Sequence, residues 1–116
     1  MNGNRWVYFK DDEVQGLDTE LVASLDLARG KSGVPFIITS GLRTQDQNQE
    51  CGGVHDSAHM TGNAVDLRCD DSASRFMMVN ALIQVGFCRI GLYASDGHLH
   101  CDNSKVLPQN VIWVHQ

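Results

Sequence analysis

The segment Ala-Val-Asp-Leu-Arg-Cys at residues 64–69 alternates between two kinds of side chain. Such alternation, with a period of two, is typical of a β-strand that has one face in the core. Asp66 and Arg68 then share one face with Ala64, and the apolar residues between them form the other. An acid beside the core is costly to bury without a partner. This segment therefore predicts a sheet with one polar face and a partner for Asp66.

Apolar side chains at helical spacing predict two helices. The first begins at Asp18 or Thr19 and runs to about residue 29, and the second begins at Asp71 or Ser72 and runs to about residue 85. The side-chain oxygens of these residue types cap a helix by accepting hydrogen bonds from its first turn. We expect the inward faces to be Leu21, Val22, Leu25 and Ala28 in the first helix and Phe76, Val79, Leu82 and Ile83 in the second.

Short runs of β-branched and aromatic residues predict the other strands. They lie at residues 34–39, 88–93, 98–102 and 111–114, and residues 5–9 form either a first strand or an arm. Residues 40–63 are rich in Gly, Ser, Asn, Gln and Asp and predict a long loop, with a helical turn near 44–49. We expect one α+β domain over residues 1–116, with two main helices and a small, mostly antiparallel sheet.

The composition argues against several classes of function. The formal net charge of −5 disfavours nucleic acid as a partner, because phosphate binding requires a basic face. The apolar stretches are far shorter than the roughly 20 residues that span a membrane, so no membrane insertion is expected. Residues 1–13 lack the apolar core of a secretory signal. We therefore expect a protein that is cytoplasmic when synthesised. We also expect a monomer.

The chain has four cysteines, Cys51, Cys69, Cys88 and Cys101, and none of them forms a C-x-x-C pair. This spacing argues against a structural zinc knuckle. An even number permits two disulfides, but without a secretory signal we expect reduced thiols.

The polar loop leads into a group of residues suited to a metal ion. A long loop in so small a domain is usually functional. His59 precedes the strand that carries Asp66, and Gly62 allows the chain to turn back so that the two side chains meet. His98 and His100 are two residues apart on another strand, so both can face the Asp66 side. Two neutral imidazoles and a carboxylate suit catalytic zinc, with one position left for a water whose pKa falls to about 7.

A rival pattern pairs His55 with His59, four residues apart as in the H-E-x-x-H motif. That motif requires a helix, and the glycines around this segment disfavour one. It also requires a glutamate after the first histidine, where this chain has Asp56. We therefore prefer the three-residue set.

The segment Ser57-x-His59-x2-Gly62-x-Ala64-x-Asp66 resembles the S-x-H-x-x-G-x-A-x-D signature of the zinc D-Ala-D-Ala peptidases. That group includes D-Ala-D-Ala carboxypeptidases, vancomycin-resistance dipeptidases and phage L-Ala-D-Glu endolysins, within the larger LAS group that also contains lysostaphin and the hedgehog domain. The H-x-H at residues 98–100 and the S-G-x-R-T at residues 40–44 are similar to other segments of these proteins. The resemblance runs from about residue 14 to 115.

The resemblance implies a role for each matching residue. Zinc would be bound by His59, Asp66 and His100. Arg43 would bind the carbonyl or terminal carboxylate of the substrate, to which a planar guanidinium is well suited. Ser57 would orient a ligand or be a plain loop serine, and His98 would stabilise the oxyanion or move a proton.

The chain departs from the family pattern at one position. Dipeptidases and many endolysins of this family have a catalytic acid three residues before the last histidine, where this chain has Gly97. Asp96 is one residue earlier and is either the general base or a turn aspartate, since Asp-Gly is a common turn pair. If Asp96 has no catalytic role, His98 is the remaining candidate for the proton acceptor. Asp102 shares a face with His100, and we expect it to hold a ligand or Arg68.

These patterns lead to two main hypotheses, beside a third, a disulfide-stapled secreted domain without metal. The first is a zinc peptidase that hydrolyses a bond in peptidoglycan stem peptides, either D-Ala-D-Ala or L-Ala-D-Glu. It resembles a phage lysis or virion enzyme that reaches the wall once released or carried in the particle. The second is a zinc-containing binding module without activity, as the hedgehog domain illustrates on this scaffold.

Overall fold

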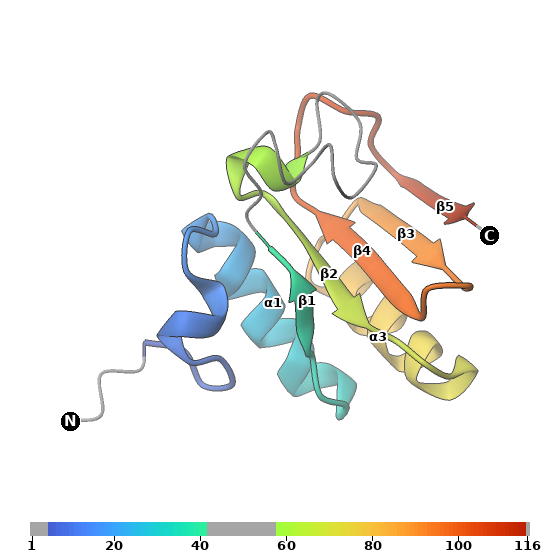
Figure 1. Ribbon diagram of the computed structural model, residues 1–116, viewed down its shortest axis with the longest axis horizontal. Helices are drawn as coiled ribbons and strands as arrows, with labels where there is room; N and C mark the ends of the chain where they lie inside the picture. Colours follow the sequence, from blue (N-terminus) through green and yellow to red (C-terminus); the bar gives the residue numbers. More distant parts are fainter. Residues whose placement is uncertain (1–4, 42–57, 116) are drawn as a thin grey trace.

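A single five-stranded sheet organises the computed structural model, which describes residues 5–41 and 58–115 (Figure 1). The strands lie in the order β1-β2-β4-β3-β5, and all neighbours are antiparallel except β3 and β5. This arrangement confirms the predicted α+β fold with a mostly antiparallel sheet. The strands are β1 (Ile38–Ser40), β2 (Ala64–Arg68), β3 (Arg89–Tyr93), β4 (His98–Asp102) and β5 (Val111–His115).

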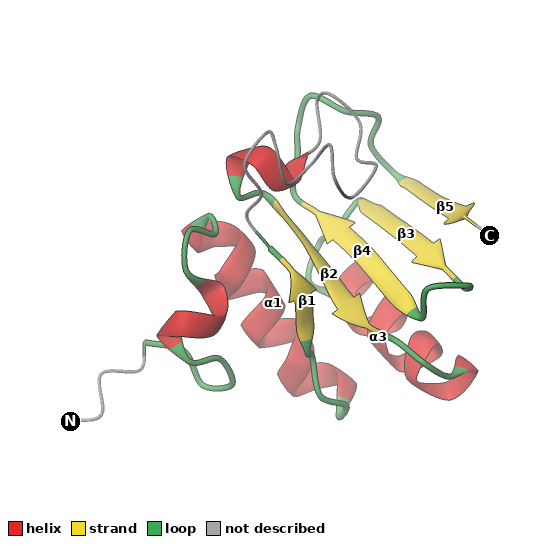
Figure 2. Ribbon diagram, viewed as in Figure 1, coloured by secondary structure: helices red, strands yellow, loops and turns green. Residues whose placement is uncertain are grey.

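Two α-helices of the described residues, α1 (Thr19–Ser32) and α3 (Ser72–Gln84), cover one face of the sheet (Figure 2). Asp18 caps α1 and Asp71 caps α3, because each carboxylate accepts a hydrogen bond from a backbone N–H in the first turn. The core between helices and sheet is apolar, with α1 supplying the four residues expected of it and the strands supplying Val65, Leu67, Ile90, Leu99 and Cys101. None of the described helices is both long and apolar enough to cross a membrane.

The predicted inward face of α3 was wrong in part. The helix buries Met78, Ala81 and Leu82, whereas Phe76 is 71% exposed and Ile83 is 51% exposed. Phe76 and Ile83 are seven residues apart, so they form a second apolar stripe on the side of the helix away from Met78. Both stripes have helical spacing, and the spacing alone does not say which one meets the sheet.

The structure decides between the two alternatives for residues 5–9 and shortens one predicted strand. Residues 5–9 are an arm and not a strand, since the backbone N–H groups of Val7 and Tyr8 donate to the carboxylate of Asp26 on α1. The run at 34–39 forms a strand only from Ile38, and Pro35 in this run has no N–H to donate to a neighbouring strand. The helical turn predicted near 44–49 lies outside the described residues.

The turn before β2 depends on Gly62. This residue follows the short 3-10 helix η2 (Ala58–Thr61) and has a φ of 76°. A Cβ at this position would lie 2.4 Å from the backbone oxygen of Gly16. Only glycine fits, and the turn places His59 of η2 beside the start of β2, as the sequence predicted.

The face of the sheet away from the helices carries polar and aromatic side chains in three rows. Strand pairing aligns the Cα atoms of each row across the sheet, and alternate residues of each strand belong to this face. The central row is Ser40, Asp66, His100, Gly91 and Trp113. The rows on either side are Ala64, Asp102, Arg89 and Val111, and Arg68, His98, Tyr93 and His115.

Three cysteines lie among the described residues, and all three are free thiols. Cys69 and Cys101 are buried and Cys88 is exposed. Burial raises the pKa of the Cys69 and Cys101 thiols, so both stay protonated at neutral pH. Cys51 lies outside the described residues.

Candidate metal centre

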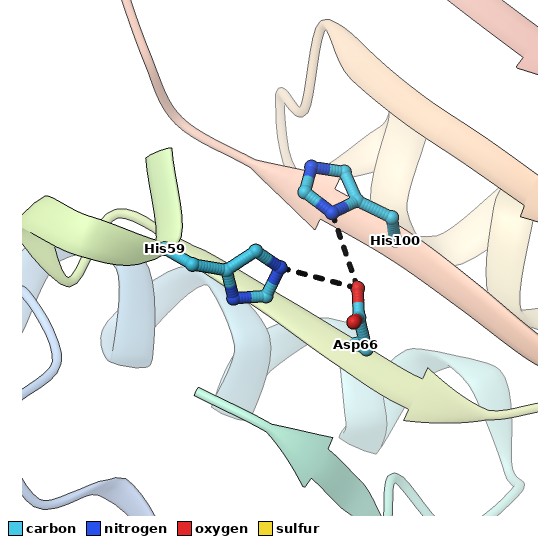
Figure 3. A group of neighbouring side chains, drawn as sticks. All are labelled: His59, Asp66 and His100. Carbon is cyan, nitrogen blue, oxygen red and sulfur yellow. Dashed lines mark hydrogen bonds and ion pairs between the residues drawn. The ribbon is translucent and has the colours of Figure 1, made fainter. Parts of the chain in front are cut away.

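His59, Asp66 and His100 come together on the polar face of the sheet (Figure 3). They belong to η2, β2 and β4, and one ligand atom from each lies within 4.8 Å of the other two. Asp66 is in the middle: its Oδ1 is 3.3 Å from His59 Nε2 and 3.1 Å from His100 Nδ1. The three residues that the sequence selected as ligands are thus within reach of one ion.

The backbone fixes the orientation of the His59 ring. Nδ1 lies 2.8 Å from the carbonyl oxygen of Gly41, which can only accept, so Nδ1 carries the proton and donates it. Nε2 then carries the lone pair and faces Asp66. A histidine that binds a metal through one nitrogen and donates to a carbonyl through the other is the usual arrangement of such ligands.

A carboxylate fixes the orientation of His100. Its Nε2 donates to Asp102 Oδ2 over 2.7 Å, which turns Nδ1 toward Asp66. Asp102 is itself buried and accepts a second hydrogen bond, of 2.8 Å, from Arg89 Nε. The predicted contact between Asp102 and a ligand is therefore present, but its arginine partner is Arg89. Arg68 is instead at the surface, 3.7 Å from Asp70.

The charges of the cluster favour a cation. Burial raises the pKa of the Asp66 carboxyl, but in the absence of a metal the hydrogen bonds and charges of His100 and His59 in their protonated forms outweigh burial and bring this pKa well below its ordinary value. Burial lowers the pKa of His100, but hydrogen bonds and charges from Asp102 and Asp66 outweigh it and raise this pKa overall. The site thus holds an ionised carboxylate that attracts positive charge, and its two nitrogens and one oxygen fit zinc.

His98 and Asp96 lie beside the cluster. His98 Nε2 is 3.9 Å from Asp66 Oδ2, and His98 Nδ1 is 3.9 Å from Asp96 Oδ2. The side chain of His98 is 20% exposed and that of Asp96 is 64% exposed, so the histidine faces the site and the aspartate faces solvent. Gly97 closes the β3–β4 turn with a φ of 66°, a left-handed backbone conformation that favours glycine.

Two predicted substrate-binding residues, Arg43 and Ser57, lie outside the described residues, as does His55. Their roles stay predictions. Sequence reasoning missed Arg89, Tyr93 and Trp113, which also lie on the polar face. Extending the two-residue alternation of β4 to β3 would have selected Arg89 and Tyr93, but nothing in the sequence shows that β5 pairs with β3.

Comparison with known proteins gave a family match and a structural match. The model of the family described as Peptidase M15 matches residues 7–102. The crystal structure of Serratia marcescens L-Ala D-Glu endopeptidase ChiX has a similar fold, with a TM-score of 0.64 and 21% sequence identity over 81% of this chain and 85% of that chain. No curated protein matches the sequence.

Proposed function

The chain belongs to the peptidase M15 family, and from this premise we propose that it is a zinc-dependent peptidase that hydrolyses a bond in peptidoglycan stem peptides. The family assignment confirms the resemblance to the zinc D-Ala-D-Ala peptidase group that the segment at residues 57–66 indicated. The observation that carries the proposal is the His59–Asp66–His100 cluster, with both imidazole rings oriented by hydrogen bonds outside it.

His59 Nε2, Asp66 Oδ1 and His100 Nδ1 would hold the zinc ion. When bound, zinc supplies a Lewis acid that polarises a carbonyl and makes water a better nucleophile at neutral pH. The two histidines, His59 and His100, need no rearrangement of their hydrogen bonds to Gly41 and Asp102 to accept it. Such outer hydrogen bonds orient ligands and increase their basicity.

His98 is our candidate for proton transfer. Among the histidines that the structure describes outside the cluster, it lies nearest Asp66, and it can take a proton from attacking water and return it to the leaving amine. Asp96 lies on the opposite side of the ring and would stabilise its protonated form, or would itself act as the base after a rotation toward the site. Arg43 would bind the substrate carbonyl or carboxylate, and Ser57 would orient a ligand.

The substrate proposal follows from the family and from the structural neighbour. The neighbour is named an L-Ala D-Glu endopeptidase, which supports this bond as the first one to test. Cleavage of D-Ala-D-Ala is the other candidate. We further propose that the protein is made in the cytoplasm and meets the wall when it is released or carried in a phage particle.

The test is digestion of purified peptidoglycan with and without a chelator, followed by mass spectrometry of the released fragments. We expect chelator-sensitive cleavage at one type of bond, and none by the Asp66→Ala variant. The masses of the fragments identify the bond.

A second candidate function is zinc-dependent binding without hydrolysis. It is favoured by one observation, the glycine at position 97 in place of the family's usual acid. A protein that binds one zinc ion, binds peptidoglycan and releases no fragment would support this candidate and contradict the peptidase proposal.

A further inference from the structure

We propose that Trp113 on β5 is a positioning residue of the metal centre, which holds His100 and His98 in a fixed relation to each other. The inference rests on the proposed function, because it takes His100 as a metal ligand and His98 as the proton carrier. Strand β5 follows the segment matched by the family model, which ends at residue 102. It contributes no ligand to the cluster. Two of its side chains reach residues of the site: Trp113, and His115, whose ring stacks on Tyr93 with centroids 5.1 Å apart.

The first contact of Trp113 is with the ligand His100 itself. The two residues are in the same row of the sheet, with Gly91 of β3 between them. Because Gly91 has no side chain, the indole lies over it: a Cβ there would be 2.5 Å from Trp113 Cε2. The indole thereby reaches the imidazole, with ring centroids 5.3 Å apart and planes at 49°.

The second contact of Trp113 is with Arg89, which supports His100 through Asp102. The Arg89 guanidinium carbon is 5.0 Å from the Trp113 ring centroid, a cation–π distance. Arg89 donates to Asp102, and Asp102 accepts from His100 Nε2. Trp113 therefore packs against His100 directly and against the residue that anchors its carboxylate partner.

The third contact leads to His98. Trp113 Nε1 donates a 3.0 Å hydrogen bond to the Tyr93 hydroxyl. The Tyr93 ring stacks on His98, with centroids 4.4 Å apart and planes at 11°. The indole of Trp113 thus contacts His100 directly and reaches His98 through Tyr93. A change at Trp113 therefore affects both histidines.

Two substitutions test this arrangement in different ways. Trp113→Ala removes the indole, and Gly91→Ala leaves it in the chain but forces it off its place over β3. Ile112→Ala is the matched control, since Ile112 is on β5, faces away from the site and is 52% exposed. Each variant is compared with the unsubstituted protein in zinc affinity by chelator competition, in the absorption spectrum with Co²⁺ in place of zinc, and in kcat and KM on peptidoglycan.

For Trp113→Ala and Gly91→Ala we expect zinc affinity to fall by about tenfold or more, the range typical when support of a ligand is lost. The Co²⁺ spectrum should shift, and kcat should fall with KM unchanged. Trp113→Phe keeps a ring against His100 but loses the bond to Tyr93, so it should retain zinc affinity and lose kcat. Ile112→Ala should match the unsubstituted protein in all three measurements.

The inference is overturned if Trp113→Ala raises KM alone, because the indole would then contact the substrate. It is also overturned if Trp113→Ala gives the same results as Ile112→Ala. If Trp113→Ala does not fold, Gly91→Ala and Trp113→Phe decide the question. A protein that binds zinc but cuts no peptidoglycan disproves the proposed function, and zinc affinity and the Co²⁺ spectrum still test the role of Trp113. A protein that binds no zinc disproves both.

Discussion

At the scale of single residues, we expect Asp66 to link folding to metal binding. Its carboxylate lies between two imidazoles on a strand whose other face is in the core. Replacing Asp66 or His59 by alanine should abolish zinc binding and lower the melting temperature together, because the energy of metal binding is coupled to folding. Metal analysis and thermal unfolding of the zinc-loaded protein check this. His98→Ala is the control: it should keep zinc and lose activity, and loss of zinc would show that His98 is a ligand.

Zinc binding should strengthen as pH rises. The neighbouring carboxylates raise the pKa of His100 above its ordinary value of 6.5, whereas zinc requires the neutral ring. In the metal-free protein, the stability contributed by protonated His100 is fully present below pH 6.5 and is lost as pH rises through the raised pKa. Displacing this proton should increase zinc affinity by up to about tenfold per pH unit in that range. Chelator competition at pH 6 to 9 measures it.

The control for this experiment is Asp102→Asn, which removes one of the two carboxylates that raise the pKa of His100. Its zinc affinity should level off at a lower pH than that of the unsubstituted protein. A zinc affinity that does not change with pH would contradict the assignment of His100 as a ligand.

The proton carrier can be identified by comparing Asp96→Asn with His98→Ala. Asp96 is mostly exposed and 3.9 Å from His98, so we expect its loss to reduce kcat by less than tenfold, as an exposed ion pair is worth less than about 1 kcal/mol. His98→Ala should cost about a hundredfold or more, the typical contribution of general acid–base catalysis. A larger loss from Asp96→Asn than from His98→Ala would make Asp96 the base.

The three proposed ligand residues could be selected from the sequence because backbone geometry brings the candidate residues together and the resemblance to the zinc peptidases chooses His100 over His98. His59 and Asp66 flank a glycine turn, and His98 and His100 alternate on a strand. The residues that orient the proposed ligands could not be selected from the sequence. Arg89, which replaces the expected Arg68 beside Asp102, is 13 residues away along the chain, and its role depends on how β3 and β4 pair.

At the scale of elements, the turn at Gly62 determines where η2 sits. Gly62→Ala should destabilise the protein by about 3 kcal/mol or more, since it adds backbone strain to a clash with the Gly16 carbonyl. It should also weaken zinc binding by moving His59. Gly33→Ala is the matched control: it has a similar φ of 74° but no atom within 4 Å of the added Cβ. It should cost only about 1 kcal/mol. Urea unfolding measures both, and equal costs would contradict the steric argument.

Element types were easier to predict than their faces and lengths. Caps at Asp18 and Asp71 begin both helices where the sequence indicated, since capping depends on local hydrogen bonds. The buried face of α3 was partly wrong because two apolar stripes compete and tertiary packing chooses between them. The arm at residues 5–9 has the composition of a strand, but its backbone bonds to the Asp26 side chain on α1.

At the scale of the whole molecule, the metal should stabilise the fold. The cluster joins η2, β2 and β4, which are held otherwise by backbone pairing and by the shared core. At a zinc concentration of a hundred times Kd, the free energy of unfolding should rise by about 2.7 kcal/mol, or roughly 10 °C in Tm. Calorimetry with zinc and with excess chelator measures this. The Asp66→Ala variant should show no difference between the two conditions, and an equal shift in that variant would contradict binding at this site.

The two faces of the sheet place a restriction on how this chain can vary in length. On β4, His98, His100 and Asp102 face the site while Leu99 and Cys101 are in the core. One residue inserted after Leu99 would turn the rest of the strand over, sending His100 and Asp102 into the core and Cys101 to the site. Related sequences should therefore gain or lose residues in the segments before and after β4, at 94–97 and 103–110, and keep the spacing of residues 98–102 unchanged.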